Sequence, residues 1–202
     1  MVKMFHVEQF YFSSIIIAKR KFYMQIFNLE IDDETGLVRM SLVNSPAVEV
    51  DFLAFSKEEK KAMYFADEEK HIVTGVALRA DFPVYRVAEN GEEFYVNFTP
   101  SVIEKCVQKF MREQRGGEVD LEHNGKKVSG VYLFESYILR GGLKDERFAD
   151  VKEGSWVVSY KVDNEEVWAK IKSGELKGFS VEGYFFENSD TADFDEWIRN
   201  FI

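Results

Sequence analysis

Alternating hydrophobic and polar residues recur in short stretches along the chain, and this period of two is typical of β-strands. The stretches cover residues 25–31, 37–43, 71–78, 84–86, 94–96, 119–123, 128–139, 156–162 and 178–183. The polar turn at 32–36 predicts a hairpin between the first two stretches. Asn-Gly pairs at 90–91 and 124–125 predict two further hairpins, each between the stretches that flank the pair.

Two segments have the period and the end signals of helices. Thr99 suits the N-cap and Pro100 the first turn of one helix, whose apolar residues recur at helical spacing on one face. Asp163, with Glu166 three residues later, suits the capping box of a second helix that Gly178 would end. Many short strands with two helices predict an α+β, mostly β domain, built as a bent β-barrel surrounded by helices.

The chain has 202 residues, enough for one domain with a hydrophobic core. We expect a single folded domain over residues 24–188, an extension outside the fold at 1–23 and a short helical tail at 189–202. The apolar run at 10–17 is too short to span a bilayer, so no membrane partner is expected.

Charge and cysteine content exclude several classes of function. The formal net charge of −10 disfavours nucleic acid as a partner, because phosphate binding needs an excess of Lys and Arg. The single cysteine, Cys106, rules out an intrachain disulfide and is typical of a reducing compartment. One cysteine and three histidines leave little material for a zinc site, so we expect no metal and no cofactor.

A glycine-flanked strand in the last quarter of the chain carries a candidate nucleophile. Read as a strand, it places Phe179 and Val181 on one face and Ser180 with Glu182 on the other. A serine hydroxyl needs a base to accept its proton, and His123 is a candidate because imidazole titrates near neutral pH. From the residues alone, a histidine on an apolar strand face is more often a core residue, so both interpretations stay open.

Four segments, in order along the chain, resemble the XkdF-type phage serine proteases, which belong with the prohead (procapsid maturation) proteases of tailed phages. They are LEHNG at 121–125, VSGVYLFES at 128–136, WVVSYKV at 156–162 and IKSGELKGFSVEG at 171–183. The resemblance extends from about residue 24 to residue 186. It implies the fold of prohead proteases and herpesvirus assemblins, a bent β-barrel ringed by helices.

The resemblance also implies an activity, that of a serine endopeptidase that cleaves scaffold, capsid-protein extensions and itself during capsid maturation. The family's nucleophile falls on Ser180 and its base on His123, with backbone N–H groups expected to bind the oxyanion. Scaffold and major capsid protein would be the substrates, a homodimer the functional unit, and the procapsid in the host cytoplasm the location.

A departure from the family pattern concerns the acid that would complete a catalytic triad. Many prohead proteases carry this acid after the serine, at the start of a Ser-Leu-Val segment followed by Pro-Ala. Here a similar segment lies near the N-terminus, and Arg39 stands in the position of the acid. We therefore expect a circular permutation in which residues 37–43 join the sheet of the Ser180 strand from the other end of the chain.

Other carboxylates remain as candidates to orient the base. Glu135 is the preferred third catalytic member, because it shares a predicted strand face with apolar residues and needs a partner there. Glu182 and a Ser–His dyad without an acid are alternatives. The rival function is a non-catalytic capsid-assembly or scaffold protein with the same fold, and a glycoside hydrolase has no positional support.

Overall fold

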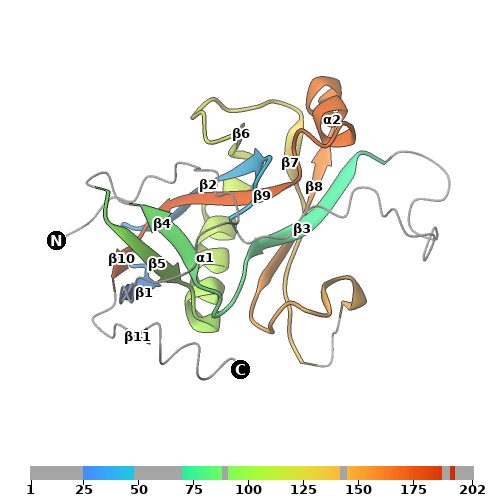
Figure 1. Cartoon of the computed structure of the whole chain (residues 1–202). Helices are drawn as coiled ribbons and strands as arrows, with labels where there is room; N and C mark the ends of the chain where they lie inside the picture. Colours follow the sequence, from blue (N-terminus) through green and yellow to red (C-terminus); the bar gives the residue numbers. More distant parts are fainter. Residues whose placement is uncertain (1–24, 48–69, 88–90, 142–144, 188–191, 194–202) are drawn as a thin grey trace, which may run out of the picture.

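The described part of the chain forms three β-sheets and two α-helices (Figure 1). The computed structural model describes residues 25–47, 70–87, 91–141, 145–187 and 192–193. The prediction of an α+β, mostly β fold is confirmed. The strand orders of the three sheets are open within these residues, and none closes into a barrel. The predicted extension at 1–23 lies outside the described residues.

The largest sheet is mixed and has strand order β10-β1-β5-β4, with β11 also paired to β1. Its strands are β1 (Gln25–Glu30), β4 (Val84–Val87), β5 (Glu93–Asn97), β10 (Phe186–Glu187) and β11 (Ala192–Asp193). β4 and β5 pair antiparallel, as the Asn-Gly signal predicted. β11 is the only described part of the predicted C-terminal tail.

The second sheet has strand order β6-β2-β9 and holds the candidate site. Its strands are β2 (Gly36–Val43), β6 (Val119–Leu121) and β9 (Gly178–Tyr184). The predicted hairpin between the first two strands is wrong, because β1 and β2 belong to different sheets. A residue of the first helix holds the turn between them, since Lys109 Nζ donates to the backbone carbonyls of Asp32, Asp33 and Thr35. These bonds direct the chain into the second sheet.

The third sheet has strand order β3-β8-β7, both pairs antiparallel, and its β3 runs close to β9. Its strands are β3 (Ile72–Leu78), β7 (Val131–Ile138) and β8 (Trp156–Val162). The hairpin predicted at Asn124-Gly125 is wrong, because β6 pairs with β2 and β7 pairs with β8. The Gly125 N–H donates to the Asp120 carboxylate at 2.8 Å, so the turn folds back on β6 instead of starting its partner strand.

Both helices lie close to where the sequence predicts them. α1 (Pro100–Arg112) starts after Thr99, whose side chain accepts the Val102 N–H, as expected for this N-cap. α2 (Glu165–Lys172) is capped by Asn164 instead of Asp163: the Asn164 side chain accepts the Glu166 and Val167 N–H groups, while the Asp163 carboxylate pairs with Lys161 at 2.7 Å. α2 also ends earlier than predicted, and Gly178 is the first residue of β9. Two short 3-10 helices, η1 (Arg115–Gly117) and η2 (Glu146–Phe148), complete the described elements.

One hydrophobic core joins α1 to all three sheets. In Figure 1, α1 lies in the middle, with β4 and β5 on one side and β3, β7 and β8 on the other. Phe110 of α1 packs edge-on against Trp156 of β8, and Tyr160 of β8 packs against Phe179 of β9. Cys106 is fully buried in this core, and burial raises the pKa of its thiol to about 12, so it stays protonated at neutral pH.

Candidate active site

Three polar side chains stand in one row across the second sheet. Ser41, in the middle of β2, is the register partner of Ser180 on β9 and of Asp120 on β6. Directly paired residues of neighbouring strands point to the same face of a sheet, so the three side chains are neighbours. Their residues are almost completely enclosed, with exposed fractions of 0% for Ser41 and Asp120 and 4% for Ser180. The sheet therefore carries a row of three buried polar side chains, which we call the polar row.

The predicted alternation of the Ser180 strand is confirmed. Phe179 is fully buried and packs against Tyr160 in the core, whereas Ser180 points to the opposite face of β9. The expectation that residues 37–43 join this strand is confirmed as well, since β2 is the antiparallel partner of β9 along its length. Glu182, two residues beyond Ser180, faces Arg39 of β2.

His123 lies in a tight turn directly after β6, and not in a strand as the sequence predicted. Glu122 and His123 both have left-handed backbone, with φ of 51° and 53°. The turn is tied to the sheet by the Glu122 N–H, which donates to the Leu42 carbonyl at 3.1 Å, and by the bond from Gly125 to Asp120. Two consecutive left-handed residues other than glycine cost roughly 1–3 kcal/mol each and mark a strained segment of the kind found at functional sites. This left-handed backbone turns the His123 imidazole back toward the polar row.

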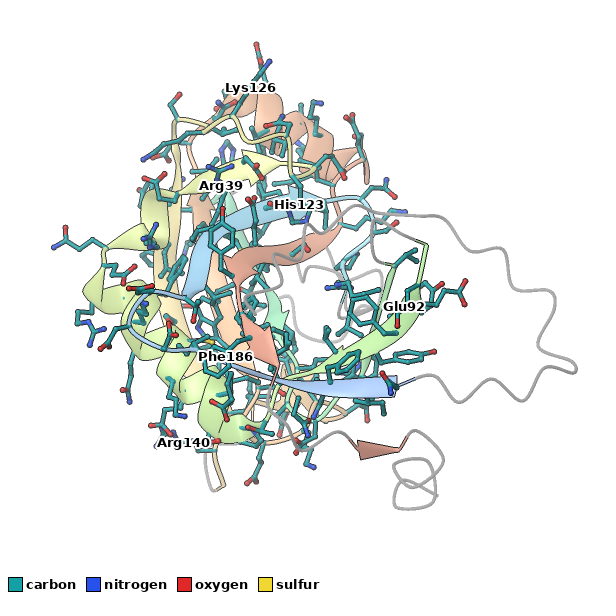
Figure 2. All side chains as sticks on the ribbon, turned by 90° about the vertical axis from the view of Figure 1, so that its left-hand side faces the viewer. Arg39, Glu92, His123, Lys126, Arg140 and Phe186 are labelled. Atoms are coloured by element: carbon teal, nitrogen blue, oxygen red, sulfur yellow. The ribbon has the colours of Figure 1, made fainter. Side chains whose placement is uncertain are left out.

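The structure brings His123 and Ser180 together. His123 Nε2 and Ser180 Oγ are 2.9 Å apart, a hydrogen-bond distance, although the two residues are 57 positions apart in the sequence. Figure 2 shows His123 and Arg39 near one another along β2, at the opposite end of the molecule from Arg140. The arrangement is that of a nucleophile and its general base.

The second nitrogen of the His123 ring contacts a residue that sequence reasoning missed. Nδ1 lies 3.0 Å from Ser41 Oγ, and the Ser41 hydroxyl in turn donates to Asp120 Oδ1 at 2.5 Å. The signal that could have found Ser41 was present, because it belongs to the Ser-Leu-Val segment that resembles the family's acid-bearing strand. In this segment the family's acid position falls on Arg39, two residues before Ser41.

Asp120 is a buried carboxylate with several donors around it. Its Oδ1 accepts the Ser41 hydroxyl, and its Oδ2 accepts the Gly125 N–H and lies 3.3 Å from Arg39 NH1. The same guanidinium nitrogen lies 3.7 Å from the Glu182 carboxylate. The side chains of Arg39 and Glu182 are about a quarter exposed, 25% and 24%. Two partly exposed charged side chains, Arg39 and Glu182, thus lie beside the buried polar row.

Glu135, the preferred third member, lies in a different sheet. It projects from β7, and its Oε2 accepts the hydroxyl of Ser159 on β8 at 2.7 Å. Ser159 also bonds to Thr74 on β3 at 2.9 Å, so Glu135 ends a polar row across the third sheet. At the His123 ring, the position next to Nδ1 is held by Ser41.

Two features of the described residues bear on other classes of function. They contain no group of three or more His, Cys, Asp or Glu side chains placed to hold a metal ion. Among these same residues, no helix combines the length and the apolar character needed to cross a bilayer.

Comparison with known proteins identifies the family. A family model described as "Putative phage serine protease XkdF" matches residues 59–187. In Bacillus subtilis (strain 168), the uncharacterized protein YqbD is 32% identical over 129 residues, which cover 64% of this chain and 36% of that protein. The phage-like element PBSX protein XkdF of the same organism is 29% identical over 156 residues, 71% of this chain and 50% of that protein. The chain spans half or less of the length of these curated relatives, and no solved structure matches it. The chain belongs to the XkdF-type phage serine protease family.

Proposed function

We propose that this protein is a serine endopeptidase in which Ser180 is the nucleophile and His123 the general base. The observation that carries the proposal is the 2.9 Å contact between Ser180 Oγ and His123 Nε2. The contact joins two side chains from separate segments, one of which adopts a strained backbone to reach it. A hydroxyl held at the ring nitrogen of a histidine is the pair that acyl transfer requires.

The proposed reaction uses this pair twice. Ser180 Oγ attacks the carbonyl carbon of the scissile peptide while its proton passes to His123 Nε2. The imidazolium then protonates the amine nitrogen, the C–N bond breaks, and the acyl group remains on Ser180. In the second half, water gives a proton to the same imidazole and attacks the acyl carbon. The ester bond to Ser180 breaks, the peptide acid leaves, and the imidazolium returns the proton to Ser180 Oγ. In this proposal the carbonyl group approaches Ser180 from the side of Arg39 and Glu182, whose side chains are about a quarter exposed.

The finer parts of the proposal rest on the family resemblance. The substrates are the phage scaffold, capsid-protein extensions and the protease itself, cleaved inside the procapsid in the host cytoplasm. The complete fold is the bent barrel of prohead proteases and assemblins, in which the three sheets are sectors of one wall. The functional unit is a homodimer. The family membership and the mostly β architecture support these assignments.

A fluorophosphonate probe tests the proposal, since it reacts covalently with serines that a neighbouring base activates. We expect the purified chain to be labelled and the Ser180→Ala variant not to be. The matched control is Ser101→Ala, which removes an exposed serine from α1 and should leave labelling unchanged.

The rival function gives the opposite result. A non-catalytic capsid-assembly protein with this fold has no need for an activated serine. Absence of labelling in the wild type, both purified and in assembled procapsids, contradicts the protease and favours the rival. Labelling that persists in Ser180→Ala contradicts the assignment of the nucleophile.

A further inference from the structure

We infer that Asp120, acting through the Ser41 hydroxyl, fixes the proton of His123 on Nδ1 and thereby keeps Nε2 ready to accept the Ser180 proton. Ser41 and Asp120 are positioning residues in this inference, since neither touches the reacting atoms. The inference rests on the proposed function, because it assigns the groups that prepare the same histidine. It replaces the single carboxylate of a triad with a hydroxyl backed by a buried carboxylate.

The direction of each hydrogen bond follows from a count of protons. Asp120 Oδ2 accepts from the Gly125 N–H and faces Arg39 NH1, which are donors only, so this side of the carboxylate carries no proton. Its Oδ1 accepts the one proton of the Ser41 hydroxyl at 2.5 Å. Toward His123 the Ser41 oxygen then has only lone pairs to offer, so Nδ1 must be the nitrogen that carries hydrogen.

The same chain of hydrogen bonds determines that Nε2, the other nitrogen of the His123 ring, carries no hydrogen. A neutral imidazole with hydrogen on Nδ1 has a lone pair on Nε2. That lone pair faces Ser180 Oγ at 2.9 Å, so the serine hydroxyl donates to it. The tautomer that a general base needs is therefore selected before substrate arrives, by a negative charge two hydrogen bonds away from the His123 ring.

An amide at position 120 should reverse the donor and acceptor roles along the hydrogen bonds from residue 120 through Ser41 to His123. In Asp120→Asn, the amide oxygen has to face Gly125 and Arg39, because both are donors. The amide NH₂ then occupies the place of Oδ1 and donates to Ser41, which frees the Ser41 proton for His123 Nδ1. Hydrogen moves to Nε2, and the imidazole loses the lone pair that accepts the Ser180 proton. The substitution replaces one carboxylate oxygen by an NH₂ group and keeps the shape of the side chain.

The test is NMR of the full chain with ¹⁵N-labelled histidine, at a pH where the ring is neutral. Long-range ¹H–¹⁵N correlations show which ring nitrogen carries hydrogen, and His6→Gln and His71→Gln variants assign the other two histidines. We expect Nδ1–H in the wild type and in Ser180→Ala, and Nε2–H in Asp120→Asn. The fluorophosphonate labelling rate of Asp120→Asn should fall by about 10³-fold or more, as expected for the wrong tautomer.

A matched pair of serine variants separates the effect of the Asp120–Ser41–His123 relay, the chain of two hydrogen bonds described above, from the general effect of removing a buried hydroxyl. Ser41 and Ser159 are both fully buried, and each donates to a carboxylate across neighbouring strands. Ser41→Ala should lower the labelling rate at least about tenfold, because His123 loses the acceptor at Nδ1. Ser159→Ala, in the sheet of Glu135, should leave both the tautomer and the rate unchanged.

The outcomes distinguish the inference from the proposed function. Nδ1–H retained in a folded Asp120→Asn variant overturns the relay and leaves the Ser180–His123 pair standing. An equal effect of Ser41→Ala and Ser159→Ala overturns it as well. If Asp120→Asn does not fold, Ser41→Ala supplies the same test. Labelling that does not depend on Ser180 overturns the assignment of the nucleophile, and absence of labelling overturns the protease, while the tautomer measurement remains valid on its own.

Discussion

Lys109 places a positive charge inside the turn that joins β1 to β2. Its residue is only 8% exposed, and Nζ donates to three backbone carbonyls, at 3.0 Å to Asp32, 2.7 Å to Asp33 and 2.6 Å to Thr35. An ammonium group has three protons, so these bonds use its full donor capacity. The lysine takes the place that a bound cation would hold in a loop of converging carbonyls.

Removing this charge should destabilise the protein. In Lys109→Met the three carbonyls lose their common donor, and we expect the free energy of unfolding to fall by about 2–4 kcal/mol. The control is Lys105→Met on the same helix, whose exposed pair with Glu30 should contribute about 0–1 kcal/mol. Urea unfolding followed by circular dichroism measures both, and equal losses for the two variants would contradict the role of Lys109.

At the residue scale, the sequence predicts the reacting pair better than the groups behind it. Ser180 and His123 could be found because a strand pattern and a family resemblance both point to them. Ser41 carried one sequence signal, its place in the Ser-Leu-Val segment, but its role and that of Asp120 become visible only when the strand register pairs the two residues with Ser180. The choice of Glu135 failed to anticipate Ser41 for the same reason, because its strand proved to belong to another sheet.

Gly183 fixes how closely β9 approaches β2. A Cβ at this position would lie 2.5 Å from the Gly36 carbonyl oxygen and 3.0 Å from the Leu37 Cα, both backbone atoms that cannot move aside independently. The two strands also change register nearby, between Leu37 and Arg39. Gly183 is three residues from Ser180, so the spacing of β9 and β2 at this glycine affects the position of Ser180 relative to Ser41.

Gly183→Ala should therefore affect both stability and activity. We expect a loss of about 1–3 kcal/mol in unfolding free energy from overpacking, together with slower fluorophosphonate labelling because β2 and Ser41 shift relative to Ser180. The control is Gly117→Ala, where an added Cβ meets nothing within 4 Å. Thermal unfolding and labelling rates measure both variants, and similar behaviour of the two would refute the close approach.

At the element scale, local signals predict elements but not their partners. The N-cap at Thr99 and the antiparallel pairing of β4 with β5 are correct because each depends on neighbouring residues alone. The two wrong hairpins fail where a side chain outside the turn holds it, Lys109 from 74 positions away in one case and Asp120 from the preceding strand in the other. Turn composition contains no information about these contacts, so the three-sheet arrangement could not be derived from it.

The molecule as a whole carries a charge that opposes self-association. Two copies with a formal net charge of −10 each repel one another, and salt screens this repulsion. If the homodimer is the active unit, the fluorophosphonate labelling rate per molecule should rise with protein concentration, and rise at lower concentration when salt is added. A series of dilutions at two salt concentrations, with sedimentation to measure mass, tests this. A rate that is flat across the dissociation range excludes gating by dimerisation.

The boundary of the matched family region has a practical consequence for anyone who shortens this protein. Residues 59–187 contain the nucleophile and the base, yet β2 lies before them, between the strands that carry Asp120 and Ser180. A fragment cut at these limits would keep both reacting groups and lose the strand that spaces them. Expression of that fragment would yield an incomplete sheet with two unsatisfied inner edges, and it would be a poor substitute for the longer chain in any assay.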